Sequence, residues 1–199
     1  MRSLTPRIVL ELLAQEGLVR EAYRDSQGIW TWSVGITGAS GHRVYPRYKD
    51  NPQPVSRCLE VYIWLLRERY LPPVLDAFAS HDPAEHELAA ALSFHWNTGA
   101  IRRASWVARF LRGEREAARS AFLRWNRPPA IVARRRREAA LLFEGAWSNN
   151  GTAPVYSVAK PSYRPIRPVW QDLSETVADL IEPGRPDESM QVRRPAARA

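Results

Sequence analysis

Three polar residues near the N-terminus have the types and spacing that acid–base hydrolysis requires. Glu16 follows an amphipathic run, Asp25 comes nine residues later, and Thr31 lies six residues beyond Asp25. A carboxylic acid, a carboxylate and a hydroxyl that holds a water are the groups that hydrolyse a glycosidic bond with inversion. Because two carboxylates at one spacing are common by chance, ordinary polar residues at a helix end and a turn remain the alternative.

The flanking sequence places these residues on a helix and a hairpin. Thr5 suits a helix N-cap and Pro6 suits the first helical position, which predicts a helix over residues 5–16 before a glycine. Residues 18–45 are rich in glycine and in β-branched and aromatic residues, and predict a small antiparallel sheet of two or three strands. We therefore expect Glu16 at a helix C-terminus, where unsatisfied carbonyls disfavour a carboxylate and suit a general acid.

The middle of the chain is predicted to be helical. The double proline Pro72-Pro73 is expected to end the first of these helices. The expected fold class is α+β, mostly α, with the small antiparallel sheet at the N-terminus and a helical C-terminal lobe. Apolar periodicity and turn residues predict helices over residues 56–71, 82–96, 101–112, 114–124 and 131–144.

The composition changes after the last of these helices. Residues 153–168 carry four prolines and little periodicity, which predicts an extended linker. A short amphipathic helix is expected over residues 175–182. We therefore expect a compact domain over residues 1–148 and a proline-rich, largely disordered or extended tail over residues 149–199.

Composition leaves several classes of partner open. The 199 residues carry a formal net charge of +8, so nucleic acid, anionic wall polymers and acidic lipid all remain candidates on charge alone. Cys58 is the only cysteine, which excludes an intramolecular disulfide. The sequence shows no transmembrane segment and no signal peptide, so we expect synthesis in the cytoplasm without autonomous export.

Residues 16–31 resemble the active-site signature of the phage T4-type lysozyme family, glycoside hydrolase family 24. The family pattern is Glu-Gly at the end of the first helix, then Tyr-x-Asp-x-x-Gly, an aromatic residue and Thr. Residues 93–100 are similar to the family's Phe-Asn-x-Gly-x-Gly-Ala turn, and residues 131–138 to its Arg-Arg-x-x-Glu ending. The resemblance covers about residues 5–147 in the family's order.

The resemblance implies a lysozyme-like fold and a role for each site residue. Glu16 would protonate the leaving oxygen, Asp25 would act as base for the attacking water or support it electrostatically, and Thr31 would hold that water. Arg134 and Arg135 would approach the catalytic carboxylate from behind. The alternative for this arginine run is a solvated basic face.

The resemblance leaves other positions less certain. Phe94 and Ser105 fall near family positions that line the saccharide groove, and the alternatives are core packing and a helix cap. Ile36 stands where the family usually has a histidine. His81 and His86 lack a second pair of ligands, so neither a metal site nor a cofactor is expected.

The leading hypothesis from the resemblance is a monomeric muramidase that acts on peptidoglycan during phage-encoded lysis. It would be made in the host cytoplasm and would reach the periplasm after a holin-like lesion permeabilises the membrane. One alternative is a virion-associated wall-opening or structural component that retains the lysozyme fold and uses the tail to bind a virion partner. Another is a nucleic-acid-binding protein, suggested by the charge and by residues 134–137, although no recognised nucleic-acid motif is present.

Overall fold

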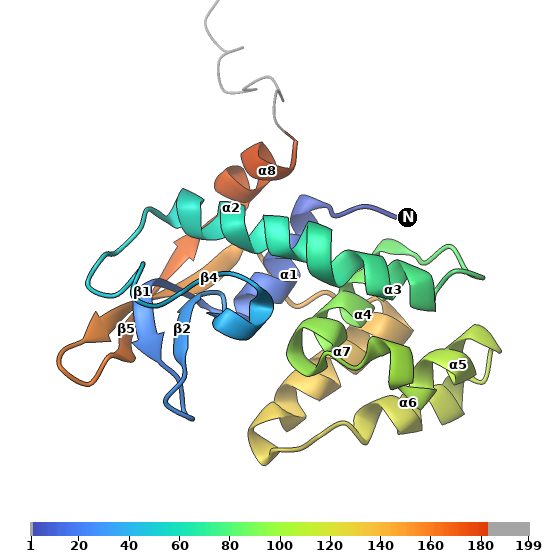
Figure 1. Cartoon of the computed structure of the whole chain (residues 1–199). Coiled ribbons are helices and arrows are strands. Elements are labelled where there is room, and N and C mark those ends of the chain that lie inside the picture. Colours follow the sequence, from blue (N-terminus) through green and yellow to red (C-terminus); the bar gives the residue numbers. More distant parts are fainter. Residues whose placement is uncertain (1, 183–199) are drawn as a thin grey trace, which may run out of the picture.

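The computed structural model describes residues 2–182, which form two lobes (Figure 1). Within this range no helix combines the length and the apolarity needed to cross a bilayer. The strands are β1 (Leu18–Arg24), β2 (Trp30–Ser33), β3 (Ile36–Thr37), β4 (Thr152–Ala159) and β5 (Arg164–Asp172). The helices are α1 (Pro6–Glu16), α2 (Val55–Leu65), α3 (Leu71–Ala77), α4 (Glu85–Thr98), α5 (Ser105–Leu111), α6 (Arg115–Leu123), α7 (Val132–Glu144) and α8 (Ser174–Ile181).

One lobe contains the sheet with α1 and α8, and the other contains α4 to α7 (Figure 1). Helices α2 and α3 run end to end across both lobes. Because binding sites occur preferentially where domains or lobes meet, the elements at this junction are the ones expected to carry the site.

Helix α1 forms as the sequence predicts. The hydroxyl of Thr5 accepts a hydrogen bond from the Ile8 amide at 3.2 Å and caps the helix, and Pro6 is its first residue. The buried apolar face of the helix anchors it in the core. The helix ends at Glu16 because Gly17 adopts a φ of 71°, a value that favours glycine. Glu16 is thus fixed at a helix C-terminus.

The sheet is larger than predicted. Its strand order is β3-β2-β1-β4-β5, and β1, β2 and β3 form the expected antiparallel unit. Strand β4 pairs with β1 in parallel, with Leu18 opposite Val155, and β5 pairs antiparallel with β4. The sheet is therefore mixed, and two of its five strands come from the C-terminal part of the chain.

The prediction of an extended linker over residues 153–168 was wrong. This segment forms β4 and most of β5, and the short helix predicted after it is confirmed as α8. Pro165 and Pro168 are compatible with β5 because this strand lies at the sheet edge, where a missing amide donor is tolerated. Pro154 lies in β4, just before the residues Val155 and Tyr156 that pair with β1. The remainder of the predicted tail, residues 183–199, lies outside the described residues. We propose that the catalytic unit extends past residue 148 to residue 182.

The double proline does not end a helix as predicted. Residues 66–70 form a π-helical turn, and Pro72 and Pro73 lie in the first turn of α3 directly after it. Proline is tolerated at the start of a helix because its missing amide has no intrahelical partner there. The π turn joins α2 to α3 and lets the chain continue across both lobes.

Candidate active site

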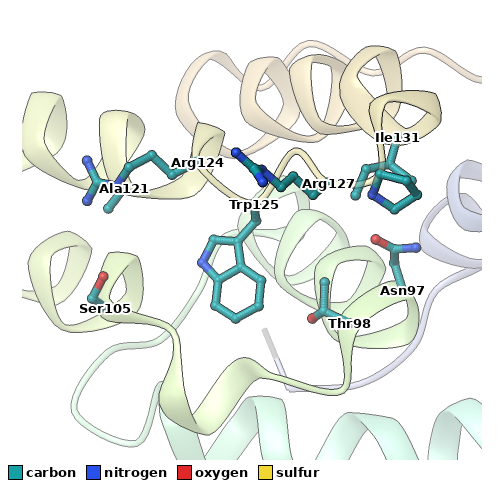
Figure 2. Close-up of a pocket in the computed structure, with 9 residues that line it drawn as sticks. Asn97, Thr98, Ser105, Ala121, Arg124, Trp125, Arg127 and Ile131 are labelled. Carbon is teal, nitrogen blue, oxygen red and sulfur yellow. The ribbon is translucent and has the colours of Figure 1, made fainter.

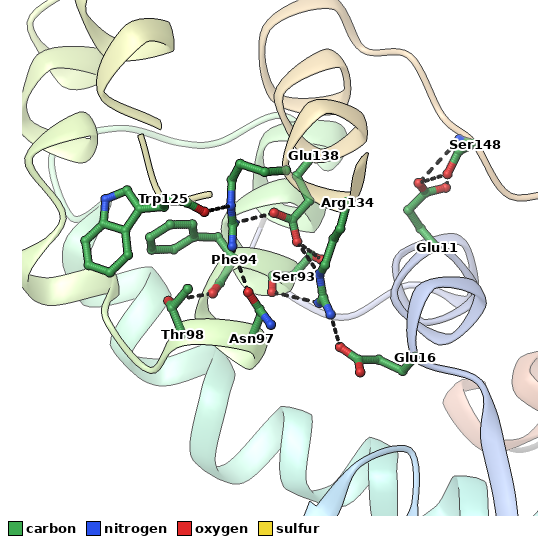
Figure 3. A network of polar contacts seen from close by, with 11 residues as sticks. Glu11, Glu16, Ser93, Phe94, Asn97, Thr98, Trp125, Arg134, Glu138 and Ser148 are labelled. Atoms are coloured by element: carbon green, nitrogen blue, oxygen red, sulfur yellow. Dashed lines mark hydrogen bonds and ion pairs between the residues drawn. The ribbon is translucent and has the colours of Figure 1, made fainter. Parts of the chain in front are cut away.

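Glu16 meets an arginine from the other lobe. Its carboxylate forms an ion pair with the guanidinium of Arg134 on α7, and the side chains are 19% and 10% exposed, respectively. Figure 3 shows Glu16 at the edge of a polar network, where its only drawn contact is with Arg134. The structure thus places Arg134 next to the Glu16 carboxylate.

Arg134 is held by three further acceptors. Its Nε donates to Glu138 Oε1 at 2.8 Å, and its Nη2 lies 3.2 Å from both the carbonyl and the hydroxyl oxygen of Ser93. Ser93 in turn donates its hydroxyl to Glu138 at 2.6 Å. Because the guanidinium is planar and its donors have a fixed geometry, these contacts set the direction from which it reaches Glu16.

Arg135 ties the same carboxylate to a neighbouring loop. It forms an ion pair with Glu138 and donates to the Trp125 carbonyl at 2.9 Å and to Asn97 Oδ1 at 2.7 Å. Arg134 and Arg135 are buried, whereas Arg136 and Arg137 are exposed. The arginine run is thus a solvated face only in its second half, and Arg135 supports the network without a contact to Glu16 among those described.

Glu138 is fully buried and shared by two arginines, so its loss should be costly. We expect Glu138→Leu to lower the free energy of unfolding by about 3–5 kcal/mol, because two guanidinium groups lose their buried partner. Chemical denaturation measures this change. The matched control is Glu144→Gln on the same helix, whose exposed pair with Arg119 should contribute at most about 1 kcal/mol. Equal losses in the two variants would contradict the network.

Asp25 begins the turn between β1 and β2. Its Oδ1 accepts hydrogen bonds from the amides of Gln27 and Ile29, both at 2.9 Å. One carboxylate oxygen therefore holds the turn in shape. The other oxygen, Oδ2, is directed toward Thr31 at 3.5 Å. Oδ1 of Asp25 thus stabilises the turn, whereas Oδ2 remains available to accept a proton.

Thr31 is almost fully buried on β2, with 3% of its surface exposed. Its hydroxyl is 3.1 Å from the Ile29 carbonyl and 3.5 Å from Asp25 Oδ2. A hydroxyl has one proton, and the shorter contact takes it. The lone pairs of Thr31 Oγ1 then remain available, and a water that donates to both oxygens would bridge Thr31 and Asp25.

Tyr23 lies close to both carboxylates. Burial raises its pKa well above the usual range, and the negative charges of Glu16 and Asp25 raise it further. Tyr23 is also the register partner of Thr31 across β1 and β2. Gly35, in the turn after β2, also lies close to Glu16, because a Cβ placed on this glycine would be 3.8 Å from Glu16 Oε2. Tyr23 therefore lies within electrostatic reach of Glu16 and Asp25 and opposite Thr31 in the sheet.

A pocket of about 500 Å³ opens in the helical lobe (Figure 2). Ser105, Trp125 and Asn97 line it, and the indole of Trp125 projects into its centre in the view of Figure 2. Asn97 is the residue that accepts from Arg135, so the pocket and Glu16 are connected through one hydrogen-bond network. Ser105, the exposed first residue of α5, lies on the wall of this pocket.

Phe94 requires a correction. Its ring is fully buried and packs edge-on against Trp106 and Trp125, with ring centroids 5.3 Å and 5.2 Å away. A side chain with no exposed surface does not line a groove, so the alternative of core packing is the right one. The aromatic ring instead supports Trp125, which reaches the pocket.

Several residues of the site belong to segments that resemble the family, but the sequence assigned them no role. Glu138 stands four residues after Arg134, a spacing that predicts a pair on one helix face and was available in the sequence. Ser93 and Asn97 come from α4, and no local pattern links them to α7. Ile36, at the position of the family histidine, is fully buried in the core.

Comparisons with known proteins agree with this architecture. A family model described as "Phage lysozyme" matches residues 14–138. Among solved structures, a mutant of P22 lysozyme aligns with a TM-score of 0.58 and 25% identity, over 71% of this chain and 99% of that chain. An endolysin from the Escherichia coli O157:H7 phage FAHEc1 aligns with a TM-score of 0.57 and 20% identity, over 75% and 98%. The muramidase domain of SpmX from Asticaccaulis excentricus aligns at 0.53 and 21%, over 71% and 98%. A comparison with curated proteins gives no match.

Proposed function

Because the chain belongs to the phage lysozyme family and is thus a lysozyme-type peptidoglycan hydrolase, we propose that it is a muramidase that inverts the anomeric centre. It cleaves the β-1,4 bond between N-acetylmuramic acid and N-acetylglucosamine. The observation that carries this proposal is the approach of Asp25 Oδ2 to the Thr31 hydroxyl, 3.5 Å away, on the strand pair that directly follows Glu16.

Glu16 acts as the general acid. It is half-buried at the junction of the lobes, and the network behind Arg134 fixes the direction of its carboxyl group. A positioned acid transfers its proton to the leaving oxygen as the glycosidic bond breaks. The arginine sits on one side of the carboxyl group through Oε1, which leaves Oε2, near Gly35, to face the substrate.

Asp25 and Thr31 hold the attacking water. The hydroxyl of Thr31 donates to the Ile29 carbonyl, so its oxygen accepts one proton of the water while Asp25 Oδ2 accepts the other. The water's lone pair is then directed away from these two acceptors, toward the sugar. As the bond to the anomeric carbon forms, Asp25 takes the proton that the water releases.

The pocket lined by Ser105 and Trp125 is proposed as part of the substrate-binding surface. It combines an aromatic face with polar groups, the mixture that sugars and their peptide substituents bind. Arg124 and Arg127 also line it, and their charge suits an anionic wall polymer. This cationic lining agrees with the net charge of +8.

The proposed biological role is host-cell lysis. The enzyme would be made in the host cytoplasm and would reach peptidoglycan in the periplasm after a holin-like lesion opens the membrane. A virion-associated enzyme that opens the wall locally would use the same residues on the same bond. Assay of purified virions for the protein separates these two roles.

Product analysis of digested peptidoglycan tests the chemistry. Purified sacculi are incubated with the protein, the new reducing ends are reduced with borohydride, and the products are identified by mass spectrometry. We expect the reduced ends to be muramitol, because cleavage on the reducing side of N-acetylmuramic acid exposes that sugar. Reduced glucosamine ends, or no new ends at all, would contradict the proposal.

A further inference from the structure

The tip of the β4–β5 hairpin lies against the turn that carries Asp25. The amide of Arg24 donates to the Tyr163 carbonyl at 2.7 Å. The Tyr163 ring meets the ring of Trp30 edge-on, with centroids 5.1 Å apart and planes at 75°. Arg24 and Trp30 are paired across β1 and β2, so they open and close the turn. Tyr163 therefore contacts both ends of the turn, one through its backbone and one through its ring.

Tyr163 is itself anchored on a third segment. Its hydroxyl donates to the carboxylate of Asp50, at 3.0 and 3.1 Å from the two oxygens. Lys160 bonds to Asp50 and to Glu21 on β1, and its ammonium lies 4.2 Å from the centre of the Tyr163 ring. These contacts fix the hairpin tip on the loop before α2 and on β1 at once.

The position of the Asp25 carboxylate depends on this turn. Its Oδ1 is bound by the amides of Gln27 and Ile29, so the carboxylate moves with the turn backbone. Thr31 follows Trp30 directly, so the same displacement would change the gap between Thr31 and Asp25. A shift of about 1 Å in a catalytic group can lower a rate by about 10²-fold.

We propose that Tyr163 is a positioning residue that holds the Asp25–Thr31 pair at the separation that one bridging water needs. The inference rests on the proposed function, because it assumes that this pair activates the water. Tyr163 lies outside residues 14–138, the part of the chain that the family model matches. The appended hairpin thus contributes to catalysis through the turn and has no contact with substrate in this role.

Three variants of the full chain test the proposal. Tyr163→Ala removes the ring and the bond to Asp50, and is expected to lower kcat about tenfold with KM changed by less than about twofold. Tyr163→Phe keeps the ring against Trp30 and should retain at least about half of kcat. The control is Trp170→Ala on β5, whose side chain is 63% exposed and lies away from the tip, and which should match the wild type.

Hydrogen exchange gives a readout that does not require activity. Exchange in residues 24–31 should accelerate in Tyr163→Ala and remain unchanged in Trp170→Ala, with the rest of the sheet protected in both. If wild-type protein releases no muramic ends, the proposed function fails, and exchange alone still decides whether Tyr163 holds the turn. A folded Tyr163→Ala protein with wild-type kcat overturns the positioning role.

A global effect on stability is the competing explanation. It predicts that kcat in Tyr163→Ala recovers when the assay temperature is lowered and that exchange accelerates throughout the sheet, and this result overturns the proposal. Should Tyr163→Ala fail to fold, Asp50→Ala serves in its place, because it removes the acceptor that anchors both Tyr163 and Lys160 and leaves the Tyr163 ring. It is expected to lower kcat about threefold, and an unchanged kcat overturns the proposal.

Discussion

Glu16→Gln is expected to abolish lysis while the protein stays folded. An amide has no acidic proton to transfer to the leaving oxygen, and the loss of a positioned general acid lowers the rate by at least about 10². The substituted side chain keeps an oxygen that accepts from Arg134, so the network of Figure 3 loses charge at one end without losing its shape. The measurement is kcat on purified peptidoglycan, with circular dichroism to verify the fold.

The matched control for this variant is Glu60→Gln. Glu60 forms an exposed pair with Arg57 on α2, and a change there should leave both activity and stability close to wild type. Wild-type clearing by a folded Glu16→Gln protein would contradict the assignment of Glu16 as the acid and, with it, the muramidase mechanism.

Truncation after Trp147 is expected to destabilise the protein severely. It removes Leu173 and Val177, which are buried, and the strand that pairs with β1. Burying each such side chain stabilises a protein by about 1.5–3 kcal/mol. The truncation also leaves Glu11 buried without the amides of residues 148 and 149 that bind it. Because a domain is stable by only about 5–15 kcal/mol, we expect a fall of more than about 10 °C in melting temperature.

A second truncated chain separates the loss of apolar burial and strand pairing from the effect of the unpaired Glu11 charge. When Glu11→Leu is added to the truncation, the buried charge is gone and part of the melting temperature should return. An unchanged melting temperature in the simple truncation would show that residues 148–182 lie outside the folding unit, and our proposed boundary at residue 182 would be wrong.

Local signals in the sequence predicted α1 well and the C-terminal strands poorly. The N-cap at Thr5, the proline after it and the glycine at position 17 act within a few residues of one another, so they are readable in order. Strand β4 is stabilised by pairing with β1, which is more than a hundred residues away in the sequence. The proline-rich composition of this segment does not indicate such a partner. The burial of Glu11 could not be predicted for the same reason, since its hydrogen-bond partner Ser148 is equally distant in the sequence.

The site residues likewise differ in whether local sequence could identify them. Glu16, Asp25 and Thr31 fall in one short segment, and their types indicated the chemistry before the fold was known. The support for Glu16 comes from α4 and α7, whose residues meet it only through tertiary packing. Phe94 was misplaced because an aromatic residue near a groove looks the same in sequence whether it lines the groove or packs beneath it.

The stereochemistry of the first product tests the central claim most directly. Proton NMR of a β-linked oligosaccharide during the first turnovers distinguishes the two anomers before mutarotation mixes them. A water held by Asp25 and Thr31 attacks the face opposite the leaving group, so we expect the α-anomer as the first product. Direct release of the β-anomer would contradict this mechanism, because Asp25 would then act as a nucleophile and Thr31 would hold no attacking water.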